Sequence, residues 1–180
     1  MPPQLRADAQ RNREALLRVA REALVGGEVD VRMEQIAQRS GVAVGTVYRH
    51  FDTREALVEE VFRQDLDDLC SSAADGDLHA FFLKLIAFTT RSKGVAAALE
   101  AVMVSVSPVF DESRGMLEQT LEQLLVAGAR GGSIRGDVTG RTVLRALSSI
   151  CSPVADEAES HRIVELIFDG LQFGVGTRVN

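Results

Sequence analysis

Apolar residues recur at helical spacing along nearly the whole of this 180-residue chain. Within residues 12–25 they follow the i, i+3, i+4, i+7 pattern that gathers side chains on one helical face: Leu16, Val19, Ala20, Ala23 and Leu24. The same spacing returns in the later segments 77–93, 95–106, 110–127, 141–151 and 156–173. No window alternates apolar and polar residues as a half-buried strand does. We therefore predict an all-α fold.

Two short helices separated by a tight turn are predicted in the N-terminal third. The first spans residues 33–40, and Gly41 follows it where a helix end requires a left-handed residue. The second spans about 44–51, and Asp52 or Thr53 can cap the longer helix that comes next. Together with the helix that precedes them, these elements fit a helix-turn-helix.

The second short helix divides into an apolar face and a polar arc. Residues at i, i+3, i+4 and i+7 are predicted to share one inward face: Val44, Val47, Tyr48 and Phe51. The outward arc receives the rest: Gly45, Thr46, Arg49 and His50. This arc has no carboxylate, and a glycine in its first turn lets a phosphate approach the backbone N–H groups, so it suits DNA. A core helix with a chance polar face fits the same residues about equally well.

Charge is distributed unevenly along the chain. The net charge is −6, which alone argues against a nucleic-acid partner. Residues 1–52, however, contain 8 Arg and 7 acidic residues, whereas residues 53–180 contain 12 Lys and Arg against 19 acidic residues. With a net charge of +1, only the N-terminal third is suited to approach a polyanion.

Composition also limits the compartment of the protein. Cys70 and Cys151 lie far apart without a metal-binding spacing, so we expect buried thiols rather than a disulfide. No apolar run reaches the roughly 18 residues that a membrane span needs. Residues 1–14 lack the apolar stretch of a signal peptide. We predict a cytoplasmic protein that does not enter the membrane.

Residues 33–62, MEQIAQRSGVAVGTVYRHFDTREALVEEVF, resemble the N-terminal DNA-binding domain of the TetR family of bacterial transcriptional regulators. The elements that match are Ile36-Ala37, Gly41-Val42, Gly45-Thr46, Tyr48, His50-Phe51 and Glu55-Ala56-Leu57. The resemblance covers roughly residues 11–65. It favours a DNA-binding interpretation of the second short helix over that of a plain core helix.

The resemblance implies roles for individual residues of this helix. Thr46 and Tyr48 are expected to contact phosphates. Val44 and Arg49 are expected to face the bases, and His50 is expected to lie near the DNA backbone.

Three positions depart from the usual family pattern. Arg54 stands where the family commonly has Lys, and the resemblance implies that it contacts a phosphate. Ala43 stands where a Ser often caps the recognition helix, at a cost of about 1 kcal/mol. Arg32 occupies a region where Thr is frequent and is a candidate phosphate contact in its place. The complete predicted DNA-contacting set is Arg32, Val44, Gly45, Thr46, Tyr48, Arg49, His50 and Arg54.

The resemblance further implies a C-terminal helical domain that dimerises and holds a small molecule. We predict a DNA-binding domain over 1–52, a connecting helix over 54–70, and a ligand-binding and dimerisation domain over 71–180. His79 and Arg91 are candidate polar anchors for the ligand. The predicted apolar lining, which fits a plain core as well, is Phe82, Phe88, Met103, Phe110 and Met116.

The last two predicted helices are apolar over more than one stripe. A helix with a single buried face does not need a second stripe, so one stripe is predicted to meet a partner subunit in a four-helix bundle. The predicted interface residues are Leu144, Leu147, Ile163, Ile167 and Leu171. Burial of both stripes within one subunit is the alternative.

Sequence motifs of enzymes are missing from the chain. It has no HExxH, GxSxG or P-loop glycine motif and no sequence cluster of His, Cys and Asp. We predict no catalytic residue, no metal site and no cofactor. The predicted function is a homodimeric TetR-like repressor that binds a pseudo-palindromic double-stranded DNA operator and is released by an unidentified small-molecule ligand. The alternative is a helical interaction or sensor protein whose helix-turn-helix makes protein contacts.

Overall fold

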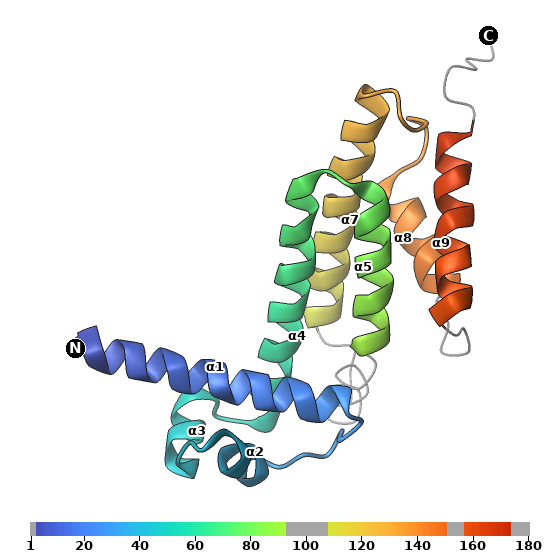
Figure 1. Cartoon of the computed structure of the whole chain (residues 1–180). Coiled ribbons are helices and arrows are strands. Elements are labelled where there is room, and N and C mark those ends of the chain that lie inside the picture. The colour runs from blue at the N-terminus through green and yellow to red at the C-terminus, as the bar shows by residue number, and fades with distance from the viewer. Residues whose placement is uncertain (1–2, 93–107, 151–156, 174–180) are drawn as a thin grey trace. The chain divides into compact units, whose positions relative to one another are not determined.

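The computed structural model describes residues 3–92, 108–150 and 157–173, and these residues form helices joined by short connections (Figure 1). The elements are α1 (Pro3–Val25), α2 (Met33–Ser40), α3 (Val44–His50), α4 (Arg54–Ser71), a 3-10 helix (Ser72–Asp75), α5 (Leu78–Arg91), α7 (Pro108–Arg130), α8 (Gly140–Ile150) and α9 (Glu157–Gln172). The all-α prediction is confirmed. The helix predicted over 95–106 lies outside the described residues.

Two compact units divide these helices. The first contains α1, α2, α3 and α4 as far as Asp65, and the second contains α4 from Leu66, α5, α7 from Phe110, α8 and α9. Each unit has its own buried apolar residues. The domain boundaries at residues 52 and 71 stay a prediction. In the part of the chain described, no helix combines the length and the apolar character that crossing a membrane requires.

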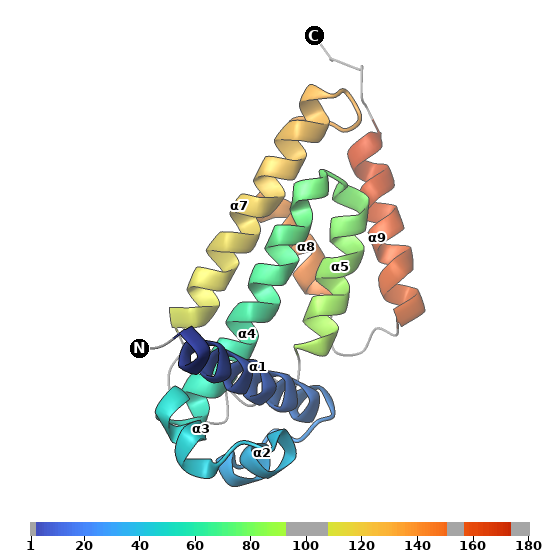
Figure 2. The same ribbon diagram turned by 60° about the vertical axis from the view of Figure 1, so that its left-hand side comes forward.

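The core of the N-terminal unit forms where α1 crosses α2 and α3 (Figures 1 and 2). The predicted apolar face of α1 is buried as expected: Leu16, Val19, Ala20, Ala23 and Leu24. The other elements contribute Ile36, Ala37, Val47, Phe51, Leu57, Val58 and Val61. Because α1 covers both short helices, it supplies the brace that a helix-turn-helix needs.

The turns on either side of α3 are set by local sequence. Gly41 has a φ of 70°, the predicted left-handed conformation, and the N–H of Val42 donates to the carbonyl of Ala37 at 3.1 Å. At the start of α4, the hydroxyl of Thr53 accepts a hydrogen bond from the N–H of Ala56 at 3.1 Å. These two local signals end α2 and begin α4 where the sequence predicts.

In the C-terminal unit, α5 and α9 lie side by side (Figures 1 and 2). The rings of Phe82 and Phe168 join the two helices, edge to face, with centroids 6.4 Å apart. The largest buried side chains come from α4, α5, α7 and α8: Leu66, Phe81, Phe82, Leu85, Leu121 and Leu147. The apolar stripes on these helices therefore pack against one another in the core.

Close contact between α7 and the start of α8 depends on Gly140. Its N–H donates to a carboxylate oxygen of Glu122 at 2.6 Å. A Cβ at this position would lie 2.4 Å from the carbonyl oxygen of Glu118 and 2.7 Å from the backbone nitrogen of Glu122. Both of these atoms belong to the backbone of α7, so the clash is relieved only by moving α8.

Gly140→Ala is accordingly expected to lower the free energy of unfolding by about 1–3 kcal/mol, a typical cost of overpacking. Thermal or urea unfolding measures the effect. Gly115 on α7 is the matched control, because a Cβ there meets no atom within 4 Å. Equal stability of the two alanine variants would contradict the close approach at Gly140.

Candidate nucleic-acid interface

Two buried side chains hold α3 to the N-terminal unit. Val47 has no exposed surface, and Phe51, just after the helix, is 5% exposed. The prediction that Val44 and Tyr48 share this buried face is wrong, because they are 41% and 43% exposed. The helix has only 7 residues, fewer than two full turns. Only a narrow stripe of its surface therefore packs against the rest of the unit. The exposure of Val44 fits the base-facing position that the resemblance implies.

The outward surface of α3 gathers the residues predicted to contact DNA. The exposed residues are Val44, Gly45, Tyr48 and Arg49. The side chains of Thr46 and His50 are half-buried. The helix contains no acidic residue. Its first turn also lacks a side-chain cap, as the sequence predicts from Ala43. The arrangement leaves neutral and basic groups on one accessible surface.

Gly45 lies in the first turn of α3, where a Cβ would meet no atom within 4 Å. Packing within the chain therefore does not require a glycine at this position. Backbone conformation does not require one either, because its φ lies outside the left-handed range. In a helix, glycine costs up to about 1 kcal/mol relative to alanine. The open space leaves room for another molecule to approach the backbone of α3 closely.

Acidic residues pair with five arginines of the N-terminal unit. The ion pairs are Arg11–Asp8, Arg13–Glu60, Arg18–Glu22, Arg21–Asp65 and Arg39–Glu28. Among the described side chains, Arg32 and Arg49 are exposed and have no carboxylate within 4.0 Å. These two unpaired charges stand at the start of α2 and near the end of α3. Within the described side chains of residues 1–65, this exposed positive charge lies on the helix-turn-helix.

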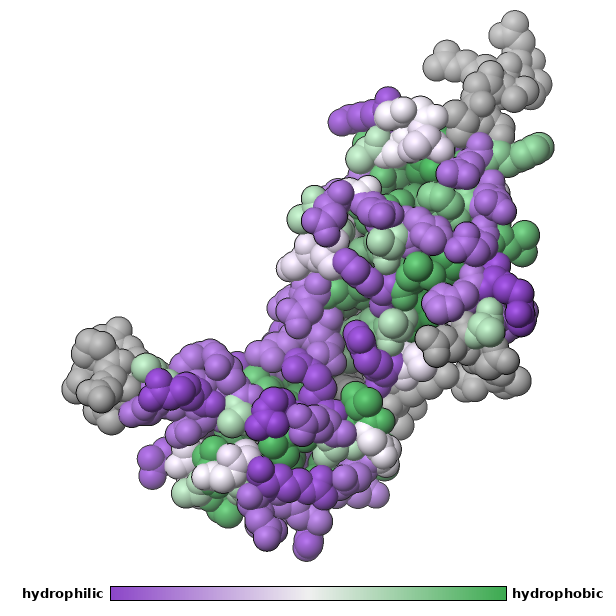
Figure 3. All heavy atoms as spheres, viewed as in Figure 1, coloured by the Kyte–Doolittle hydropathy of each residue, from purple (hydrophilic) through white to green (hydrophobic). Residues whose placement is uncertain are grey.

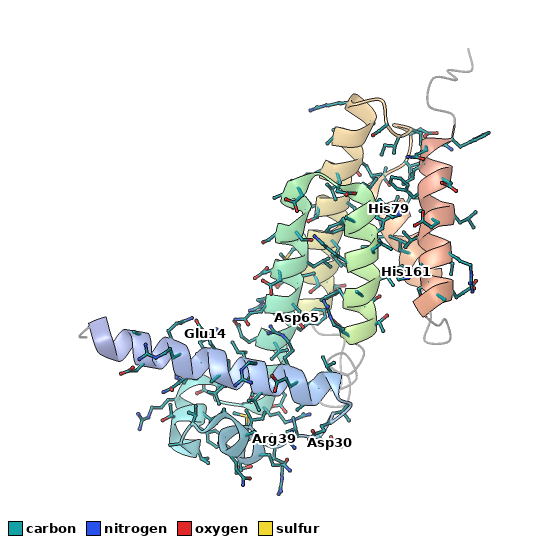
Figure 4. The ribbon with its side chains drawn as sticks, in the orientation of Figure 1. Glu14, Asp30, Arg39, Asp65, His79 and His161 are labelled. Atoms are coloured by element: carbon teal, nitrogen blue, oxygen red, sulfur yellow. The ribbon has the colours of Figure 1, made fainter. Side chains whose placement is uncertain are left out.

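Several of these pairs fix the framework behind α3. Arg13 of α1 meets Glu60 of α4 at 2.5 Å, and its guanidinium also lies over the ring of Phe51 at 5.6 Å. Asp65 of α4 extends toward α1, where Arg21 meets it at 2.6 Å (Figure 4). Because Phe51 anchors the end of α3, these contacts hold the recognition surface in place.

At the end of α2, Arg39 donates two hydrogen bonds, of 2.9 and 2.7 Å, to the carboxylate of Glu28 (Figure 4). Hydrogen bonding by the guanidinium lowers the pKa of Glu28 below its ordinary value. This bidentate pair joins α2 to the connection that precedes it.

Arg54 is engaged within the unit. Its Nε donates to the carbonyl of Val31 at 3.0 Å, and its Nη2 donates to the carbonyl of Val29. The guanidinium thus joins the start of α4 to the connection between α1 and α2. The phosphate contact implied for Arg54 stays a prediction, and in this structure its side chain has a structural role. At Arg32 only the backbone is bound, its N–H donating to the side-chain oxygen of Gln35 at 2.9 Å.

Glu34 is an acidic residue in direct contact with the recognition helix, and the sequence analysis did not identify it. The hydroxyl of Tyr48 donates a hydrogen bond of 3.1 Å to Oε1 of Glu34, from α3 to the first turn of α2. This hydrogen bond is the largest cause that raises the pKa of Tyr48 above its ordinary value of 10.0, and burial raises it further. The two positions are 14 residues apart in the sequence and belong to different helices, so only the fold reveals the contact.

Of the five residues predicted to line a ligand pocket, the structure describes three side chains. Phe82 and Phe88 are buried, and Met116 is 38% exposed on α7. Met103 and the side chain of Phe110 lie outside the described residues. A cleft of about 320 Å³ opens elsewhere, at the end of α7 and the connection after it, lined by Glu122, Leu125, Val126, Ala129, Arg130, Arg135, Gly136 and Val138. The pocket stays a prediction.

His79 is engaged between helices of the C-terminal unit. Its Nε2 lies 2.7 Å from a carboxylate oxygen of Glu165 on α9, and its ring meets Phe168 edge to face with centroids 4.9 Å apart (Figure 4). Arg91, the other candidate anchor, is exposed at the end of α5. The contacts of His79 indicate that it joins α5 to α9.

Three of the predicted dimer-interface residues are buried within the chain's own core. Leu144, Leu147 and Leu171 are only 7%, 2% and 4% exposed, so they do not form a free surface. Their stripe packs inside the C-terminal unit because α8 contacts α9 there. Ile163 and Ile167 are half-buried. The interface prediction is therefore wrong for the three leucines.

The outward apolar side chains of α9 belong to other residues. Leu166 is 72% exposed, and Phe173, just after the helix, is 81% exposed. Figure 3 shows apolar side chains at separate points of the edge where Figure 1 places α9, with hydrophilic side chains between them. These two side chains make α9 a candidate for contact with another molecule.

Comparison with known protein families assigns both parts of the chain. Residues 16–61 match the family model described as bacterial regulatory proteins, TetR family. Residues 73–173 match the C-terminal domain model of SbtR-like transcriptional regulators, within the same family. The chain belongs to the TetR family. The family match places the helix-turn-helix of α2 and α3 within the TetR N-terminal domain.

Solved structures of TetR-family regulators resemble the whole chain. The TetR transcriptional regulator SCO0520 from Streptomyces coelicolor is 33% identical, with a TM-score of 0.76, over 89% of this chain and 98% of that one. A TetR regulatory protein from Mycobacterium vanbaalenii is 32% identical, with a TM-score of 0.73, over 93% of this chain and 99% of that one. The all-helical TetR architecture thus extends through both units.

A curated relative adds a functional description. The HTH-type transcriptional repressor KstR2 from Rhodococcus jostii is 28% identical over 131 residues, which is 64% of this chain. The HTH-type regulator SAR0097 from Staphylococcus aureus is 36% identical over 67 residues, 36% of this chain. The chain spans 63% and 35% of the lengths of these two proteins.

Proposed function

We propose that this TetR-family regulator is a homodimeric repressor that binds a pseudo-palindromic DNA operator through α3 and releases it when a small molecule binds the C-terminal unit. The outward surface of α3 is the observation that carries the proposal. It combines Arg49, which has no carboxylate partner, with Gly45, where a Cβ would point into open space. An anionic surface that approaches the helix closely accounts for both features.

Each accessible residue of α3 has a role in this arrangement. Thr46 and Tyr48 donate hydroxyl hydrogen bonds to phosphates, and His50 lies beside the DNA backbone. Arg49 donates to a guanine edge while Val44 contacts a thymine methyl group. Arg32 adds a phosphate contact from the start of α2. Arg54 serves the fold, because phosphate binding would have to compete with its bonds to Val29 and Val31.

The exposed apolar side chains of α9 support dimerisation through this helix. Leu166 and Phe173 are exposed, and Ile163 and Ile167 extend the same helix face. A two-fold dimer covers such a surface with its own copy. It also presents two recognition helices about 34–36 Å apart, the spacing that successive major grooves require.

Repression and release by a ligand are the finer parts of the proposal. The repressor named among the relatives supports the direction of regulation. A ligand acts by fitting one spacing of the two recognition helices better than the other, and this difference in affinity sets the shift in operator occupancy. A regulator of chromosomal DNA in bacteria acts in the cytoplasm, which is where we place it, and no catalytic step is involved.

Selection of random DNA on the purified full-length protein tests the proposal. We expect a pseudo-palindromic site whose two halves are about one helical turn apart. Affinity for that site is expected to fall steeply as salt rises, because phosphate contacts release counterions. Absent or salt-insensitive binding would favour the alternative, a helical interaction or sensor protein that uses α3 for protein contacts.

Two substitutions separate the roles within α3. Arg49→Ala is expected to relax the base preference at one position in each half-site and to weaken binding about tenfold. Tyr48→Phe is expected to weaken binding to all sequences evenly and to leave the base preference intact. Competition binding against a panel of single-base operator variants measures both effects. If both variants keep wild-type binding, α3 does not read the DNA.

A further inference from the structure

Glu34 places a carboxylate directly on the proposed DNA-binding surface. It lies in the first turn of α2, is exposed, and accepts the hydroxyl hydrogen of Tyr48 at 3.1 Å. The described side chains place no basic group of the unit within 4.0 Å of this carboxylate. Its charge is therefore uncompensated on a surface that otherwise suits a polyanion.

The chemistry of the hydroxyl makes the two contacts of Tyr48 compete. A tyrosine hydroxyl has one hydrogen to donate, and the oxygens of a DNA phosphodiester are acceptors only. Tyr48 therefore cannot donate to Glu34 and to a phosphate at the same time. A phosphate near the hydroxyl would also lie near the Glu34 carboxylate, and two negative charges at that distance repel each other.

We propose that Glu34 limits operator affinity by holding the hydroxyl of Tyr48 in the DNA-free protein. This inference rests on the proposed function, since Tyr48 must contact DNA for the competition to matter. DNA binding then requires the Tyr48–Glu34 bond to break and the carboxylate to turn away. Glu34 is thus an affinity-setting residue that does not itself contact the operator. The raised pKa of Tyr48 agrees with a hydroxyl hydrogen held by Glu34 before DNA arrives.

Glu34 has an alternative role in which it strengthens DNA binding. The same hydrogen bond can orient the Tyr48 ring for its phosphate contact, in which case removing Glu34 weakens binding. The two roles predict changes of opposite sign in one measurement. The sign of the effect therefore decides between them.

Operator affinity of Glu34→Ala provides the test. We expect binding about fivefold to thirtyfold tighter than that of the wild type at moderate salt. In a Tyr48→Phe background the same substitution should tighten binding less, because only the charge repulsion is then relieved. Glu14→Ala is the charge-matched control, since Glu14 bonds to Gln10 within α1 and should leave affinity nearly unchanged. Unchanged or weaker binding by Glu34→Ala overturns the inference.

A measurement without DNA reads the contact itself. Tyr48 is the single tyrosine and the chain has no tryptophan, so ultraviolet absorbance during an alkaline titration reports the ionisation of this hydroxyl alone. The pKa of Tyr48 is expected to lie above 10.0 in the wild type and to fall in Glu34→Ala. Equal titration curves would contradict the bond on which the inference depends.

The outcomes distinguish failure of this inference from failure of the proposed function on which it rests. If the wild type and Glu34→Ala both fail to select any DNA, the proposed function fails and the inference fails with it. If the wild type binds its operator and Glu34→Ala binds no more tightly, only the inference fails.

Discussion

Replacing Leu166 with aspartate is expected to turn the proposed homodimer into a monomer and to weaken operator binding by about a hundredfold or more. Leu166 is 72% exposed at the centre of the outward surface of α9, with Phe173 toward its end. In a two-fold interface the same surface of each subunit meets its copy, so one substitution introduces two carboxylates into one apolar contact. A monomer then holds the operator through one half-site only.

Mass by light scattering and operator affinity measure this effect on one sample. Val126→Asp on α7 is the matched control, because Val126 is also an exposed apolar residue, 38% accessible, and lies on a different helix. This control should remain dimeric and bind DNA as the wild type does. A dimeric Leu166→Asp variant would place the subunit contact away from α9.

The helices and their ends followed from the sequence because local chemistry decides them. Gly41 ends α2 in the left-handed conformation that few other residues adopt easily, and Thr53 caps α4 with its own hydroxyl. Each signal acts within one turn of the residue that carries it. Elements of this kind can be predicted without knowing what packs against them.

The direction that each apolar stripe faces was harder to predict. Periodicity places Val44 and Tyr48 with Val47, but only Val47 reaches the core, because α3 is too short to bury a wider face. Likewise, Leu147 was predicted to meet a partner subunit but is buried in the core, whereas Leu166, which no predicted stripe includes, is exposed. Periodicity identifies which residues share a face, whereas the packing of neighbouring helices decides which face is covered.

Polar contacts between distant residues escaped sequence analysis altogether. Arg54 is a candidate phosphate ligand by its position in the motif, yet its guanidinium donates to the carbonyls of Val29 and Val31. Glu34 looks like an ordinary acid in the first turn of a helix, and its bond to Tyr48 depends on the angle between α2 and α3. Such contacts arise from tertiary geometry, which leaves no periodic trace in the sequence.

Gly45→Ala is expected to change stability and DNA binding in opposite directions. The free energy of unfolding should rise by about 0.5 kcal/mol, because alanine favours the helix and its Cβ meets no atom within 4 Å. Operator affinity should nevertheless fall by about tenfold or more, because the added methyl group occupies the space through which DNA approaches the backbone of α3. Urea unfolding and operator titration measure the two effects.

Gly115→Ala separates the helix effect from the DNA effect. Gly115 is exposed within α7, and a Cβ there also meets no atom within 4 Å, so alanine should stabilise the protein and leave operator binding unchanged. A more stable Gly45→Ala variant that still binds DNA normally would mean that no surface approaches α3 closely. Stabilisation combined with lost affinity at Gly45 alone would instead show that DNA approaches the first turn of α3 closely enough to require the absence of a side chain.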